Sequence, residues 1–136
     1  MRKTVWNRVA LLAALSLACA AGPGAEVTYH KEVEPILQQN CMECHRAAGT
    51  NTMGMVAPMA FESYEATRPW AKSISQQVES RTMPPWHAST EFDGVFKNER
   101  KLSDREIEIL VAWAKTGAQR GNPADAPPPV TFDTVD

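Results

Sequence analysis

The chain has little of what marks several large classes of protein: few cysteines, few aromatic residues and no excess of basic charge. Of its 136 residues, three are cysteine and 7% are aromatic. Of the 14 Lys and Arg residues, three lie in residues 1–20, so the remainder of the chain has 11 against 16 Asp and Glu, a net charge of −5. Nucleic-acid-binding proteins concentrate basic residues to replace counterions. We therefore expect one small domain without a nucleic-acid partner.

Long hydrophobic runs are also lacking, and the one apolar run lies near the N-terminus. Residues Val9–Ala18 follow Arg2, Lys3 and Arg8 and precede the A-x-A pattern of residues 18–20. A run of ten is too short for the roughly 20 residues that a membrane-spanning helix needs, whereas basic residues, a short apolar run and small residues are typical of a secretory signal. We expect residues 1–20 to be removed and the domain to be exported, without a transmembrane segment. Lipidation of Cys19 is the alternative, which Ser16 disfavours because lipoprotein leaders usually have Leu there.

If Cys19 leaves with the leader, two cysteines remain, and they lie in the run Cys41-Met42-Glu43-Cys44-His45. C-x-x-C-H is the pattern of covalent haem attachment. Two thiols one helical turn apart add to the two vinyl groups, and the imidazole of the next residue binds the iron. The sequence therefore predicts one haem c, with Cys41 and Cys44 as its thioether residues and His45 as the proximal iron ligand.

Three other chemistries use cysteines at this spacing. A structural disulfide between Cys41 and Cys44 would close too small a loop to stabilise much. A thioredoxin-like redox pair needs a βαβ surround, of which the sequence has no sign. A structural zinc site needs four ligands, and only the distant His30 and His87 could join the motif. Each alternative is weaker than haem attachment.

The rest of the chain is typical of an all-α domain. A short helix with Pro35 near its start runs over residues 33–40 and leads into the cysteines. Pro69 opens a second helix, in which Trp70, Ile74 and Val78 are spaced to face the core, and Pro84-Pro85 prevents the helix from continuing past Arg81. Nothing alternates with a period of two for long enough to predict a sheet. The expected fold is a small set of helices around one haem, with long loops.

The clearest helix is expected over residues 104–116. Ser103 and Glu106 form a capping box at its start, and Gly117 ends it. A proline-rich segment without the means to build a core follows. We therefore expect a domain over residues 21–122 and a tail over residues 123–136.

The sixth position of the iron decides between electron transfer and ligand chemistry. Met83 is the preferred ligand, because Pro84 and Pro85 fix the backbone directly after it. Phe61, Trp86 and Phe92 could give apolar cover to the haem, although core packing explains them equally well. Four other residues remain candidates for the sixth position: Met53, Met55, Met59 and His87.

These residues resemble the cytochrome c family. Three runs, residues 29–37, 68–74 and 81–86, together with the C-x-x-C-H motif, are more narrowly similar to a group of exported bacterial c-type cytochrome domains. The resemblance covers residues 27–129 and implies covalent haem c, axial ligation by His45 and Met83, and periplasmic electron transfer. The segment over residues 50–55 is longer than expected for this group. Members occur alone or joined to a domain similar to copper, ascorbate-dependent monooxygenases, so a copper monooxygenase-like protein is one candidate partner.

The expected function is therefore that of a monohaem electron carrier rather than an enzyme, since no set of nucleophile, base and orienting residue can be read in the sequence. A redox partner protein of unspecified identity is implied. The alternative is a haem peroxidase or gas-binding domain, which would require an open or labile sixth position.

Overall fold

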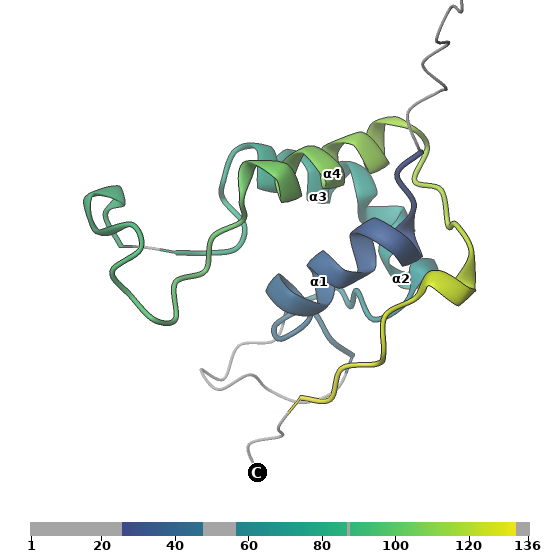
Figure 1. The fold of residues 1–136 in the computed structure, drawn as a ribbon, viewed down its shortest axis with the longest axis horizontal. Coiled ribbons are helices and arrows are strands. Elements are labelled where there is room, and N and C mark those ends of the chain that lie inside the picture. The colour runs from purple at the N-terminus through teal and green to yellow at the C-terminus, as the bar shows by residue number, and fades with distance from the viewer. Residues whose placement is uncertain (1–25, 48–56, 87, 133–136) are drawn as a thin grey trace, which may run out of the picture.

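A computed structural model of the chain describes residues 26–47, 57–86 and 88–132 (Figure 1). The expected leader, including Cys19, and the final four residues lie outside this part. The described residues contain helices and turns but no strand, which confirms the all-α prediction. None of the described helices is long and apolar enough to cross a membrane. The α-helices are α1 (Glu34–Asn40), α2 (Tyr64–Thr67), α3 (Ala71–Glu79) and α4 (Asp104–Lys115), and short helical turns are η1 (Tyr29–Val33), η2 (Arg68–Trp70), η3 (Thr90–Phe92) and η4 (Pro123–Asp125).

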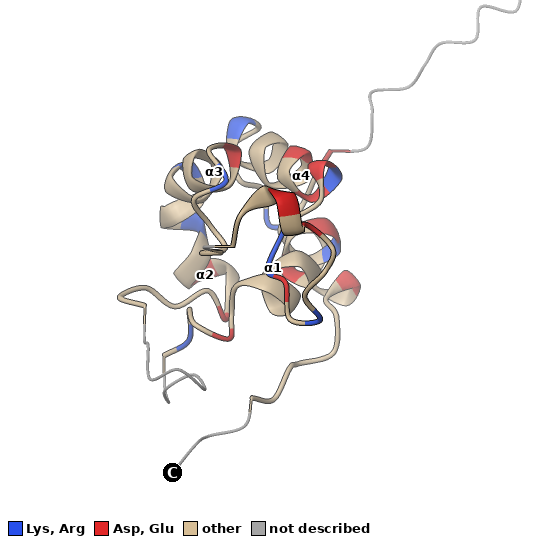
Figure 2. Ribbon diagram, turned by 90° about the vertical axis from the view of Figure 1, so that its left-hand side faces the viewer, with Lys and Arg blue, Asp and Glu red and all other residues tan. Residues whose placement is uncertain are grey.

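Helices α3 and α4 pack side by side and form the largest contact of the fold (Figures 1 and 2). From α3, Ile74 and Val78 are buried, and from α4 Leu110 and Trp113 are fully buried. These positions recur at intervals of three or four residues, so each helix turns one apolar face to the other. The burial of these side chains, rather than surface charge, stabilises the pair.

The predicted ends of α4 are confirmed in detail. The Glu106 backbone N–H donates to Ser103 Oγ at 3.3 Å, and the Ser103 backbone N–H donates to Glu106 Oε2 at 2.7 Å. Both halves of the capping box are therefore formed. The chain leaves the helix at Gly117, whose φ of +96° is a left-handed conformation that glycine adopts without a steric penalty.

The prediction that Trp70 faces the core is wrong. Trp70 is 39% exposed, whereas Ile74 and Val78 are buried as expected. The cause is that Trp70 belongs to the 3₁₀ turn η2, which Pro69 opens, and not to α3. A 3₁₀ turn advances about 120° per residue rather than 100°, which takes Trp70 off the stripe that continues along α3.

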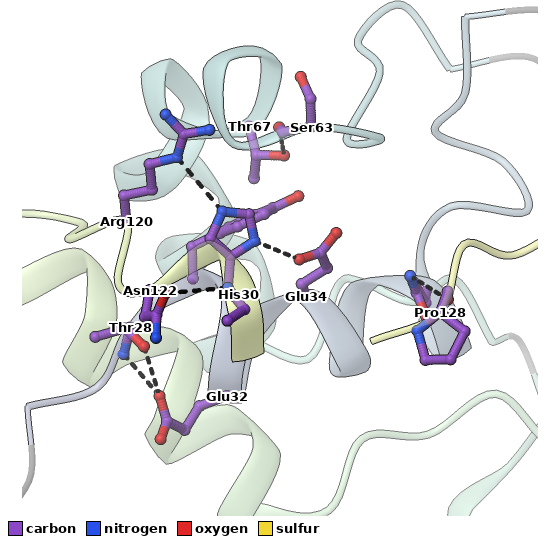
Figure 3. Close-up of polar contacts among 12 residues, drawn as sticks. Thr28, His30, Glu32, Glu34, Ser63, Thr67, Arg120, Asn122 and Pro128 are labelled. Atoms are coloured by element: carbon purple, nitrogen blue, oxygen red, sulfur yellow. Dashed lines mark hydrogen bonds and ion pairs between the residues drawn. The ribbon is translucent and has the colours of Figure 1, made fainter. Parts of the chain in front are cut away.

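The two ends of the domain meet beside α4 (Figure 3). The Tyr29 backbone N–H donates to Gln119 O at 2.9 Å, and the His30 backbone N–H donates to Arg120 O at 3.2 Å. The His30 ring lies between Glu34 Oε2, 2.7 Å from Nδ1, and Arg120 Nε, 3.4 Å from Nε2. Because arginine can only donate, Nε2 accepts and the ring proton is on Nδ1. These contacts tie the turn before α1 to the segment after α4.

The C-terminal tail, which the structure describes as far as residue 132, contacts the domain at α1 and at the core. It runs past α1 (Figure 1) and accepts a hydrogen bond from Gln38 Nε2 at Pro128 O, at 3.2 Å. The Phe132 ring packs against the core, and the Arg46 guanidinium lies over it, 5.0 Å from the centroid. The prolines restrict the tail to extended conformations, so docking costs less conformational entropy than it would for a flexible chain.

Acidic and basic residues are interspersed around the helices (Figure 2). Several form ion pairs, such as Arg105 with Glu108 at 3.3 Å on α4 and Lys115 of α4 with Glu79 of α3 at 3.8 Å. These side chains are more than half exposed. Exposed pairs of this kind contribute between zero and about 1 kcal/mol each, so they add little to the stability of the fold.

Candidate functional site

A pocket of about 530 Å³ lies beside the turn that follows α1. Its volume is within the range of about 300 to 1,000 Å³ that is usual for small-molecule and cofactor sites. Its lining includes Phe61, Trp70, Ile74, Val78, Pro84 and Leu102, so the walls are largely apolar. A pocket of this size and character fits a large, mostly apolar molecule better than a small polar substrate.

Cys41, Cys44 and His45 all line this pocket. Helix α1 ends at Asn40 with Cys41 as its C-cap, and the chain then turns, with the backbone N–H groups of Cys44 and His45 both donating to Cys41 O, at 3.1 and 3.0 Å. The spacing of the motif therefore brings both thiols and the imidazole to one wall. The two thiols are not joined by a disulfide.

The Cys41 thiol is held in its protonated form. Burial, followed by the neighbouring Cys44 and Glu106, raises the pKa of Cys41 to about 12. Because the thiolate is the reactive nucleophile, Cys41 is poorly reactive toward ordinary thiol reagents at neutral pH in this state of the chain.

Two contacts orient the His45 ring. Its Nδ1 lies 3.1 Å from Met59 O, and its plane stacks on the Phe61 ring, with centroids 4.4 Å apart and 13° between the planes. A carbonyl can only accept, so Nδ1 carries the proton and Nε2 keeps its lone pair. Metal-binding histidines commonly donate their second ring N–H to a carbonyl in this way.

The pKa of His45 also suits a metal ligand. Burial lowers the pKa of His45, and the hydrogen bond to the Met59 carbonyl only partly opposes this effect. The ring is therefore neutral at physiological pH. A neutral imidazole with a fixed tautomer is the form that binds iron.

Met83 lines the same pocket, as the sequence-based assignment requires. After α3, the backbone N–H groups of Thr82 and Met83 donate to Gln77 O at 2.9 and 3.2 Å, and Pro84 and Pro85 also line the pocket. Met83 is 38% exposed, so it is accessible from the pocket that it lines. Its backbone is fixed on both sides, by Gln77 before it and the prolines after it.

Of the four other candidates for the sixth position of the iron, the structure describes one. Met59 lines the pocket, but its carbonyl is the group behind the His45 ring. Met53, Met55 and His87 lie outside the described residues. Of the aromatic residues considered as cover, Phe61 lines the pocket, Trp86 packs edge-on to Phe96 at 5.7 Å, and Phe92 is 48% exposed.

Arg100 is a pocket residue that the sequence did not indicate. Its Nη1 lies 3.5 Å from Cys44 Sγ, and its Nη2 donates to Glu43 Oε2 at 2.7 Å. Burial lowers the pKa of Arg100, but the contacts with Cys44 and Glu43 outweigh this effect and raise the pKa overall. No short motif surrounds Arg100, and it is more than 50 residues from the cysteines, so only the tertiary structure reveals the contact.

Within the described part of the chain, no group of three or more His, Cys, Asp and Glu side chains is placed to hold a metal ion. An iron held by a porphyrin does not need such a group, because the ring supplies four ligands and the protein at most two. Comparisons with models of known protein families, with curated proteins and with solved structures gave no match for this chain.

Proposed function

We propose that the pocket binds one haem c and that the domain is an electron carrier similar to cytochrome c. The observation that carries the proposal is the convergence of Cys41, Cys44, His45 and Met83 on one largely apolar pocket. These residues come from two segments separated by about 40 positions, so their meeting is a property of the fold. The haem would supply an iron centre that takes up and releases one electron.

The residues fit the chemistry of attachment. Each thiol adds across one vinyl group: a carbon–sulfur bond forms, and the thiol hydrogen passes to the adjacent carbon, so the addition consumes no external oxidant. This reaction needs two thiols rather than a disulfide, which is the state of Cys41 and Cys44 in the structure. The spacing of one helical turn matches two attachment points on one edge of a rigid ring.

His45 would be the proximal iron ligand and Met83 the distal one. Support for His45 comes from the hydrogen bond between Nδ1 and Met59 O, which directs the lone pair of Nε2 away from the Met59 backbone. The Met59 backbone is committed to the hydrogen bond with His45 Nδ1, whereas Met83 comes from a separate segment that lines the same pocket, which favours Met83 over Met59 as the second iron ligand.

Ligation by His and Met would leave no open coordination position, so the domain would exchange electrons with a partner rather than bind substrate at the iron. We further propose that the domain is exported to the periplasm and exchanges electrons there with a redox partner protein. A protein similar to copper monooxygenases is the candidate partner that the family resemblance suggests.

The experiment is a reduced-minus-oxidised visible spectrum of the chain exported from cells that carry haem-maturation machinery. We expect the bands of low-spin c-type haem, unchanged on addition of carbon monoxide or cyanide. Rapid spectral change with either ligand would contradict the carrier function and support the alternative of a peroxidase or gas-binding domain. Absence of haem bands would contradict the whole proposal.

A further inference from the structure

Arg100 is the only lysine or arginine among the described residues that line the pocket. It comes from the connection that leads into α4, far in sequence from the cysteines. Its guanidinium reaches Cys44 Sγ at 3.5 Å and pairs with Glu43 Oε2 at 2.7 Å, and its side chain is only 25% exposed. A long cationic side chain is thus fixed against one of the two sulfur atoms that would join the haem.

We propose that Arg100, held by Glu43, sets the reduction potential of the haem, an inference that rests on the proposed function. On reduction, the iron centre gains one electron and its charge falls by one. A nearby positive charge stabilises the reduced form relative to the oxidised form, and a nearby negative charge does the opposite. Arg100 therefore raises the potential, and Glu43 lowers it.

The two charges do not cancel, because they differ in their position and exposure. The guanidinium contacts Cys44 Sγ directly through Nη1, whereas the Glu43 carboxylate contacts the other terminal nitrogen, Nη2, and is 41% exposed. The more exposed charge is screened more strongly by solvent. The net effect of the pair is to favour the reduced haem, with Glu43 fixing the rotamer of Arg100 and moderating its charge.

If the Arg100–Glu43 ion pair had a purely structural role, the reduction potentials of the variants would change in a different pattern. If the pair only braces the turn after α1, removing either partner loosens the same contact and shifts the potential in the same direction. If the charges act on the haem, removing Arg100 lowers the potential and removing Glu43 raises it. The sign of the two shifts separates the two roles.

The test is a spectroscopic redox titration of the haem-loaded protein against a mediator of known potential, for Arg100→Gln, Glu43→Gln and Arg100→Lys. Arg105→Gln is the matched control, since Arg105 forms an exposed pair with Glu108 on α4, at 3.3 Å, and does not line the pocket. A unit charge roughly 10 Å from the iron changes the equilibrium constant for reduction of the haem by on the order of two- to tenfold. A tenfold change is about 59 mV for one electron.

We expect Arg100→Gln to lower the potential, Glu43→Gln to raise it, and Arg100→Lys and Arg105→Gln to change it by less than either. Shifts of the same sign for Arg100→Gln and Glu43→Gln, or no shift in either, would overturn the inference. If Arg100→Gln fails to acquire haem, Glu43→Gln is compared with Glu43→Asp, which keeps the charge: an electrostatic role raises the potential of Glu43→Gln only, whereas a structural role shifts both variants in the same direction. Failure of the wild-type chain to acquire covalent haem would instead refute the proposed function.

Discussion

Replacing the buried Tyr29 with phenylalanine should make the domain more resistant to alkaline unfolding. Tyr29 is fully buried, and burial raises its pKa from 10.0 to about 12. Below pH 10 the hydroxyl is protonated in both the folded and the unfolded chain, so it makes no contribution to the pH dependence of stability. Between pH 10 and 12 the unfolded chain loses this proton and the folded chain retains it, so the free energy of unfolding falls as pH rises.

The magnitude follows from the pKa shift. Each pH unit in this interval costs roughly 1 kcal/mol, so the loss is about 1 kcal/mol at pH 11 and about 2 kcal/mol at pH 12. Tyr29→Phe removes this loss. At neutral pH it costs about 1 kcal/mol, because it removes the contacts of the hydroxyl with Phe61 O, at 3.4 Å, and with the Thr67 side chain.

The assay is urea unfolding of the wild type and Tyr29→Phe at pH 8, 9, 10 and 11, followed by tryptophan fluorescence. The haem-loaded form is preferable, because its thioethers do not titrate and Cys41 then contributes nothing. Between pH 9 and 11 the wild-type midpoint should fall further than that of Tyr29→Phe, by roughly 0.5 to 1 M for a typical small-protein urea dependence. Midpoints that fall in parallel would refute the reasoning, since all other titrating groups are common to both proteins.

Three further substitutions test separate parts of the structure. Met83→Ala should abolish the charge-transfer band of a thioether–iron bond and allow carbon monoxide to bind, whereas a band that persists in the absorption spectrum would move the distal assignment to another methionine. Ser103→Ala removes a helix cap and should lower the free energy of unfolding by about 1 kcal/mol in urea titrations, with no change in the haem spectrum. An unchanged midpoint would contradict this role of the cap. Phe132→Ala should lose its contact with Arg46, worth about 0.5 to 1 kcal/mol, and expose the tail to limited proteolysis, whereas Phe132→Leu retains apolar packing and should be intermediate. Equal cleavage rates in wild type and Phe132→Ala would show that the ring does not hold the tail.

The parts of the fold that the sequence predicts well are those set by local chemistry. The capping box at Ser103 and Glu106 and the stop at Gly117 depend on residues within one turn of each other. The turn that brings Cys44 and His45 beside Cys41 depends only on the end of α1. Trp70 shows the limit, since one proline changes the helix type and thereby the face to which the next residue points.

The parts that sequence reasoning missed are contacts between distant segments. The Met59 carbonyl that orients His45 is a backbone group, so no residue type at position 59 signals it. The Arg100 contact with Cys44 spans 56 positions, and the docking of Phe132 depends on the path of the whole tail. Such contacts carry no periodicity or motif, and they decide how the predicted ligands are held.

The most direct test of the central claim is whether haem stays with the polypeptide through acid–acetone extraction of the exported protein. If Cys41 and Cys44 form thioethers, the haem bands remain with the protein, and its intact mass exceeds that of the processed chain by one haem. The double variant Cys41→Ser with Cys44→Ser should release any haem it binds. Extraction of all haem from the wild type, or a mass equal to that of the chain alone, would contradict the assignment of this pocket as a covalent haem site.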